Sequence, residues 1–120
     1  KYNVVSAPVA ARMALGAAAA SGSDIAVSVT GVAGPTGGDE VRPVGTVYLG
    51  AARGDTVYVQ KLFVSRPDRA LVRARAAQAA LALALRLAQG KVPAHTKPLA
   101  ASEQHSAAAL DALNEAFLAE

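Results

Sequence analysis

The feature that most constrains the fold is a pair of strand-like runs, 46–52 and 56–64, separated only by Arg53-Gly54-Asp55. Both runs are rich in β-branched and aromatic residues, which favour strands. A three-residue connection that contains glycine is typical of a tight hairpin, so the two strands are expected to be antiparallel neighbours. Any fold for this chain therefore has to accommodate a β-hairpin in the middle of the sequence.

Residues 24–30 predict a third strand. Larger apolar side chains at 25, 27 and 29 alternate with smaller ones at 26, 28 and 30. This period of two is the pattern of a strand whose two faces meet different surroundings.

Two long helices flank these strands. Ser6, followed by Ala7-Pro8, is a suitable cap for a helix that runs to Gly22. Gly16 lies inside that helix at a cost of about 1 kcal/mol relative to alanine, which indicates close packing against a sheet or simple drift. The second helix is predicted from a Ser65 cap to about Gln89, and it is apolar on two sides, so we expect both sides to be covered.

The tail is predicted to lie outside this arrangement. Residues 91–102 contain two prolines and no periodicity, which is typical of a linker. Residues 106–120 regain helical spacing and predict an amphipathic helix that docks loosely or on a neighbouring subunit. The sequence thus divides into a domain over 1–90 and a linker with a tail helix over 91–120.

The order helix, strand, long connection, hairpin, helix predicts an α/β sandwich with a mixed sheet. Three strands make a narrow sheet for two long helices, which suggests that part of the domain is missing.

Composition excludes several classes of function. The chain of 120 residues suits one domain, and the absence of cysteine excludes disulfides and thiolate metal sites. The net charge is +3, and the basic residues are scattered, with no basic run that would indicate nucleic-acid binding.

The most apolar stretch, 81–87, is too short to span a bilayer, so we expect a cytoplasmic protein without a membrane partner. His95 and His105 are interpreted as solvated tail residues, and no metal or cofactor is expected.

The connection over residues 31–44 is unusually long and rich in glycine and proline. No lysine follows Gly34 as a phosphate-binding P-loop requires, and the dinucleotide fingerprint is absent. Glycine backbone can approach a ligand closely, and Arg42 could bind a phosphate or carboxylate. A structural turn or a mobile insertion remains an equal alternative. Arg69 and Arg73 share a helix face that is either solvated or paired with carboxylates, or else turned toward this loop or a neighbouring subunit.

The sequence shows no evident catalytic nucleophile. Ser6 and Ser65 are better explained as helix caps, and no serine lies in an elbow motif beside a base.

The loop closely resembles a family signature. TGVAGPTGG over 30–38 and RPVGTVY over 42–48 are similar to TGIAGPxGG and KPVGTVY of the CinA C-terminal domain, the nicotinamide-nucleotide amidohydrolase (PncC) family. The start of the first helix, VSAPVA over 5–10, resembles VSxxVA, and Asp68-Arg69 with Arg73 resembles DRxxVR. The resemblance spans about residues 4–90, with Arg42 in place of the usual lysine.

The resemblance implies a three-layer α/β/α sandwich with a mixed sheet, similar to an anticodon-binding domain but lacking its N-terminal strands, and it implies a homo-oligomer. It further implies hydrolysis of the carboxamide of nicotinamide mononucleotide to the acid mononucleotide and ammonia. The implied substrate-binding residues lie in and beside the loop, with Arg42 toward the phosphate: Thr30, Gly31, Ala33, Gly34, Gly37, Gly38 and Arg42.

One departure from the family pattern matters. The family nucleophile is the serine of an SCTGG motif that precedes the VSxxVA helix, and this sequence contains no SCTGG. The resemblance therefore implies the second half of the domain, with no catalytic residue of its own. Two hypotheses stand: part of an amidohydrolase that carries the nucleotide-binding loop, or a non-catalytic nucleotide-binding or oligomerisation module derived from the family.

Overall fold

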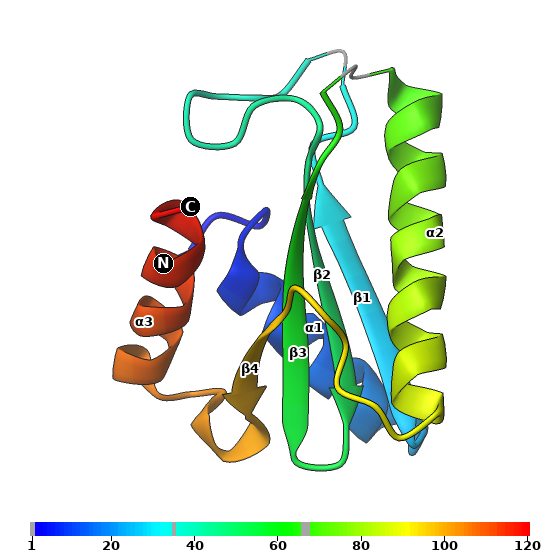
Figure 1. Ribbon diagram of the computed structural model, residues 1–120. Helices are drawn as coiled ribbons and strands as arrows, with labels where there is room; N and C mark the ends of the chain where they lie inside the picture. Colours follow the sequence, from blue (N-terminus) through cyan, green and yellow to red (C-terminus); the bar gives the residue numbers. More distant parts are fainter. Residues whose placement is uncertain (1, 35, 66–67) are drawn as a thin grey trace.

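The computed structural model describes residues 2–34, 36–65 and 68–120, which form an α/β sandwich (Figure 1). Its elements are, in chain order, α1 (Ala7–Ser21), β1 (Ile25–Gly31), β2 (Thr46–Arg53), β3 (Thr56–Phe63), α2 (Arg69–Ala88), β4 (Lys97–Ala100), the 3-10 turn η1 (Ala101–Glu103) and α3 (Ala107–Leu118).

The four strands form one sheet in the order β1-β2-β3-β4. The predicted hairpin is confirmed: β2 and β3 are antiparallel and joined at Gly54-Asp55. The sheet differs from the expected mixed sheet, because every strand pair in the described residues is antiparallel. After α2 the chain crosses to β3 and turns near His95, whose φ is 59° (Figure 1). Strand β4 then pairs antiparallel with the first half of β3, from Thr56 to Val59.

The sandwich has three layers, as predicted. Helices α1 and α3 cover one face of the sheet, and α2 covers the other. Tyr48, Val57 and Val59 point to the first face, and Val47, Leu49 and Ala51 point to the second. Alternate side chains along each strand thus contribute to the hydrophobic cores on the two faces of the sheet.

Helix α1 begins where the sequence predicts. The Ser6 Oγ accepts a hydrogen bond from the Val9 N–H at 3.4 Å. The close approach to the sheet is at Gly50 of β2, where a Cβ would lie 2.5 Å from the Ala10 carbonyl oxygen. The hydroxyl of Ser28 donates to the same oxygen at 2.6 Å. Gly16 has no atom within 4 Å of its Cβ position, so packing does not explain it.

Helix α2 begins later than predicted. Asp68 caps it by accepting from the Ala70 N–H at 2.8 Å, so Ser65 is not the cap, while Arg66 and Pro67 lie outside the described residues. Leu83 and Leu87 are buried against the sheet, whereas Leu81 is 72% and Leu85 58% exposed. The second apolar side is present, but no described part of the chain covers it.

The tail agrees with its prediction in one part and differs in another. The predicted amphipathic helix is present as α3. Within the predicted linker, however, Lys97–Ala100 forms the fourth strand, and α3 docks firmly, with Leu110, Leu113 and Phe117 buried in the same core as α1. The side chains of Phe117 and Tyr48 meet edge to face, with ring centroids 5.7 Å apart. Residues 97–118 are therefore an integral part of the fold.

Candidate functional site

The glycine-rich loop leaves the end of β1 and is fixed at its base. The Val32 N–H donates to the Thr46 carbonyl at 2.9 Å, and the Gly45 N–H donates to the Val32 carbonyl at 2.8 Å. Gly45 has a φ of 102°, and a Cβ there would lie 2.3 Å from the Val64 carbonyl oxygen. Only glycine fits this position without a shift of the backbone. The loop is thus attached to β2 and to Val64, the residue after β3, whose N–H donates to the Gly45 carbonyl at 3.0 Å.

The far part of the loop closes on a turn between Asp39 and Arg42. The Asp39 Oδ1 accepts from the Arg42 N–H at 2.6 Å and from the Val41 N–H at 3.0 Å. The Arg42 Nε donates to the Val5 carbonyl at 2.5 Å. Arg42 therefore joins the loop to the segment that precedes α1.

A pocket of about 420 Å³ lies between this loop, the segment before α1 and the start of α2. Its lining residues are Asn3, Val4, Val5, Gly31, Val32, Ala33, Gly34, Thr36, Gly37, Asp39, Arg42 and Arg69. Five of the seven residues that the resemblance implied therefore line one pocket.

The other two do not line it. The hydroxyl of Thr30 donates to the Val4 carbonyl at 2.8 Å, so Thr30 holds the segment before α1. A Cβ on Gly38 would lie 2.6 Å from the Val44 nitrogen, so Gly38 allows two parts of the loop to approach each other. The structure thus gives Thr30 and Gly38 supporting positions.

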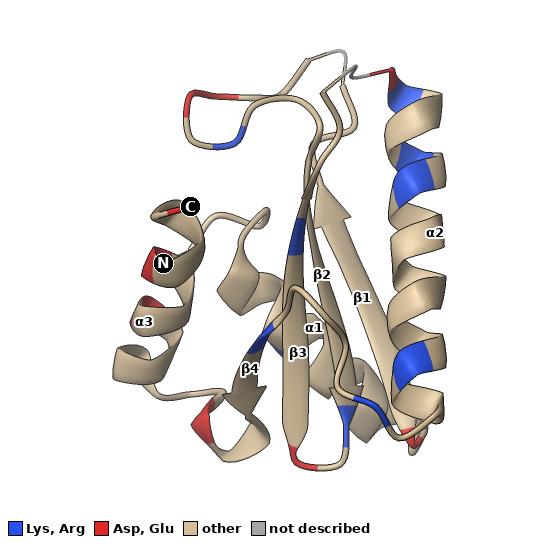
Figure 2. Cartoon of the chain, viewed as in Figure 1, with Lys and Arg blue, Asp and Glu red and all other residues tan. Residues whose placement is uncertain are grey.

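Arg69 joins the pocket although it was not among the implied site residues. It is the first residue of α2, and its Nη1 donates to the Gly34 carbonyl at 3.4 Å. Figure 2 shows basic residues on the first turns of α2, at the end that meets the loop. Arg73 is exposed and does not line the pocket. Of the two arginines expected to share a helix face, Arg69 therefore points toward the loop, whereas Arg73 does not.

The pocket carries more positive than negative charge. Two guanidinium groups, Arg42 and Arg69, and one carboxylate, Asp39, line it. The charge of Arg42 also reaches the buried Tyr48. Burial raises the pKa of Tyr48, Arg42 acts to lower that pKa, and Glu120 acts to raise it. Backbone groups of glycine together with two arginines are suited to an anion such as a phosphate.

In the described pocket residues no nucleophile is hydrogen-bonded to a base. Thr36 carries their only hydroxyl, and the one carboxylate, Asp39, accepts from the Val41 and Arg42 N–H groups. No lysine, histidine or cysteine is among them. Elsewhere, Ser6 caps α1 and the Ser28 hydroxyl is bonded to the Ala10 carbonyl. No cluster of metal-ligating side chains occurs among the described residues.

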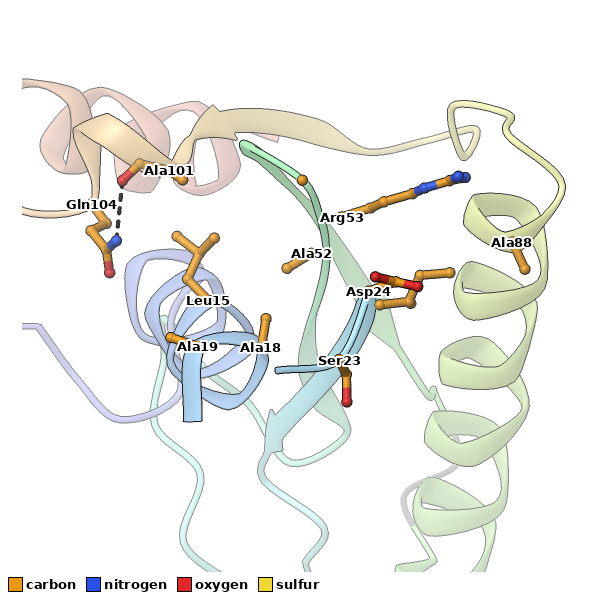
Figure 3. Close-up of a pocket in the computed structure, with 12 residues that line it drawn as sticks. Leu15, Ala18, Ala19, Ser23, Asp24, Ala52, Arg53, Ala88, Ala101 and Gln104 are labelled. Carbon is orange, nitrogen blue, oxygen red and sulfur yellow. Dashed lines mark hydrogen bonds between the residues drawn. The ribbon is translucent and has the colours of Figure 1, made fainter. Parts of the chain in front are cut away.

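A larger cavity, of about 890 Å³, lies at the opposite end of the sheet, beside the start of β1 (Figure 3). Leu15, Ala18 and Ala19 of α1 form an apolar wall, and Asp24, just before β1, and Arg53 of β2 border the cavity. The Arg53 side chain donates to the Leu87 carbonyl at the end of α2. The charged residues that line this cavity, Asp24 and Arg53, are of opposite sign, so we assign the candidate site to the smaller, more cationic loop pocket.

Fold and site together define an α/β sandwich protein with a glycine-loop pocket lined by two arginines. The chain belongs to the CinA C-terminal domain family, whose sequence model matches residues 1–88.

Named relatives support this membership. The nicotinamide-nucleotide amidohydrolase PncC of Enterobacter agglomerans is 45% identical over 86 residues, which cover 72% of this chain and 52% of the relative. A CinA-like protein of Kosmotoga olearia is 47% identical over 81 residues, which cover 68% of this chain and 19% of the relative. The chain thus spans about half of the first relative and about a fifth of the second.

Solved structures share the fold. The competence/damage inducible protein CihA of Agrobacterium tumefaciens superposes with a TM-score of 0.70 at 34% identity, over 74% of this chain and 55% of that one. A CinA superfamily protein of Escherichia coli gives a TM-score of 0.66 at 36% identity, over 72% and 49% of the two chains.

None of the helices described here is long and apolar enough to cross a membrane.

Proposed function

We propose that this chain is the nucleotide-binding part of a nicotinamide-nucleotide amidohydrolase, with its ligand, nicotinamide mononucleotide, held in the loop pocket. One observation carries the proposal: Arg42 and Arg69 line a single pocket together with Gly31, Gly34 and Gly37. Membership of the CinA C-terminal domain family and a relative named PncC support this choice of ligand.

In this proposal the phosphate lies between the two guanidinium groups. A guanidinium presents several N–H donors in a plane, and hydrogen bonds to charged groups contribute about 1.5–3 kcal/mol each. The glycines allow the ligand to approach the backbone, where a side chain would obstruct it. The pocket volume of about 420 Å³ lies within the usual range for small-molecule sites.

The proposal separates binding from reaction. Amide hydrolysis requires an activated nucleophile within reach of a base, together with donors for the developing oxyanion. Loop N–H groups could serve as donors, but the described pocket residues offer no nucleophile–base pair. The chain alone should therefore bind the mononucleotide without releasing ammonia.

Calorimetric titration and an ammonia assay on the unmodified chain test both parts. Nicotinamide mononucleotide should bind at least about tenfold more tightly than nicotinamide riboside, because only the mononucleotide has a phosphate for the arginines. Equal affinity for the two ligands would contradict a phosphate site. Ammonia release by the chain alone would contradict the separation of binding from reaction.

A further inference from the structure

The segment that precedes α1, residues 2–5, forms one wall of the loop pocket. All but its first residue line the pocket, and none of them belongs to a helix or strand. Two side chains of the site hold this segment: the Thr30 hydroxyl donates to the Val4 carbonyl at 2.8 Å, and the Arg42 Nε donates to the Val5 carbonyl at 2.5 Å. The position of this wall therefore depends on side-chain contacts and not on regular secondary structure.

The other end of the segment is bound to the tail helix. The Tyr2 hydroxyl donates a hydrogen bond to the Asp111 carboxylate of α3, 109 positions further along the chain. The Tyr2 ring also packs against the core cluster that contains Leu110 and Leu113 of α3. The hydrogen bond to Asp111, followed by burial and by the charge of that carboxylate, raises the pKa of Tyr2 above its usual value. The hydroxyl therefore keeps its proton and remains a donor to α3.

Helix α3 gives this contact a fixed position. Leu110, Leu113 and Phe117 are buried in the core beneath the sheet. Asp111 follows Leu110 directly and is half-buried, whereas Glu115, one turn further along α3, is exposed. The helix is thus held by the sheet, and Asp111 is placed to hold the N-terminal segment beside it (Figure 1).

The contacts run without a break from Asp111, through segment 2–5, to Arg42 in the pocket. We propose that Asp111 and Tyr2 are positioning residues for the loop pocket. Neither lines the pocket, so they act through the segment, which α3 keeps in place as a wall and as a partner of Arg42. Helix α3 lies beyond the family match at 1–88, so this role belongs to the tail. Its effect on nicotinamide mononucleotide rests on the proposed function, whereas its effect on the segment does not.

Hydrogen exchange of the Val5 amide in the full chain tests the positioning without a ligand. This N–H donates to the Asn3 Oδ1 at 2.8 Å, so its exchange reports how firmly the segment is held. Tyr2→Phe keeps the ring and removes the hydroxyl, and Asp111→Ala removes the acceptor. Each should make the Val5 amide exchange at least about fivefold faster, with the Leu49 amide of β2 unchanged. An unchanged Val5 amide would overturn the proposal, as would an equal acceleration at Leu49, which indicates general destabilisation.

Three further variants show whether the hydrogen bond itself is responsible. The double variant should have no larger effect than either single one, because both substitutions remove the same contact. Asp111→Asn keeps an oxygen acceptor and should have a smaller effect than Asp111→Ala. Glu115→Ala removes the exposed carboxylate and should change Val5 exchange less than about twofold. Additive effects in the double variant, or a Glu115→Ala effect as large as that of Asp111→Ala, would overturn the proposal.

Calorimetric titration with nicotinamide mononucleotide measures the consequence for the site. Tyr2→Phe and Asp111→Ala should each weaken binding about three- to tenfold, because the wall is correctly placed for a smaller fraction of the time. Glu115→Ala should leave the affinity within about twofold. Unchanged affinity together with a faster Val5 amide would contradict positioning for the ligand. Absence of binding to the unmodified chain would contradict the proposed function, and the exchange measurement would still decide whether α3 positions the segment.

Discussion

At the scale of single residues, Gly50 is the point where α1 and the sheet come closest. The carbonyl of Ala10 occupies the space that a side chain at this position would need, and the Ser28 hydroxyl bonds the same oxygen. Gly16 lies on the exposed part of α1 with open space around it. Substitution by alanine is therefore expected to change the free energy of unfolding in opposite directions at these two glycines.

Gly50→Ala should lower the free energy of unfolding by about 1–3 kcal/mol, because the added methyl group forces α1 away from β2. Gly16→Ala should raise it by about 0.5–1 kcal/mol, since alanine favours an exposed helix position. Urea unfolding followed by circular dichroism measures both. An unchanged midpoint for Gly50→Ala would mean that the contact between α1 and β2 relaxes freely.

Arg69 and Arg73 form a second matched pair. Arg69→Ala should weaken binding of nicotinamide mononucleotide about tenfold or more, because a charged partner of the phosphate is lost. Its effect on nicotinamide riboside should be much smaller. Arg73→Ala, one turn further along α2 and outside the pocket lining, should change both affinities less than about twofold. Calorimetric titrations of the two variants with both ligands measure these effects, and similar losses in both variants would point to the overall charge of α2 instead of a specific contact.

At the scale of elements, the largest difference between the expected and the observed fold lies in the tail, residues 91–120. Strand β4 extends the sheet, and α3 completes the core beneath Tyr48. Lys97 and Glu120 form an ion pair of 2.9 Å that links β4 to the end of the chain described here. These residues lie beyond the family match at 1–88, yet they cover the same face of the sheet as α1.

Phe117→Ala should cost about 3–5 kcal/mol of stability, because it removes a buried ring that packs edge to face against Tyr48. Leu118→Ala changes the neighbouring residue, which is 41% exposed, and should cost less than about 1 kcal/mol. Thermal and urea unfolding measure the difference. Comparable small losses would show that α3 is only loosely attached.

Which elements the sequence predicts depends on whether their signals are local. The Ser6 cap, the hairpin at Gly54 and the alternation from Ile25 are local patterns, and each appears in the structure close to its expected place. Strand β4 has no such pattern: four residues with a central proline become a strand only because β3 offers an edge. The mixed sheet was expected wrongly for a similar reason: β1 pairs antiparallel with β2 across the long loop, and no local pattern in residues 24–30 determines that direction.

In the candidate site, too, the residues in a local motif can be predicted from the sequence, whereas those brought in by tertiary contacts cannot. The glycine loop and Arg42 are visible as a motif, and five of its residues line the pocket. The contribution of Asn3, Val4 and Val5 is not visible, because it depends on contacts such as the Thr30 hydroxyl with the Val4 carbonyl. The sequence left several directions open for the side chain of Arg69, and only the placement of α2 against the loop decides between them.

At the scale of the whole molecule, the two ends of the sheet carry different cavities. The loop pocket, at the end of β1, has two arginines. The larger cavity, at the start of β1, has an apolar wall, one arginine and one carboxylate (Figure 3). Size alone would favour the second cavity, whereas charge and accessible glycine backbone favour the first.

A residue-resolved NMR titration with nicotinamide mononucleotide distinguishes these two ends most directly. The account predicts saturable shifts of the amides of Gly31, Gly34 and Gly37, with little change at Asp24, Arg53 and Gln104. Nicotinamide riboside at the same concentration should produce weaker shifts of the same loop amides. Shifts confined to the residues around Asp24 and Arg53, or no saturable shift in the loop, would contradict a nucleotide site in the loop pocket.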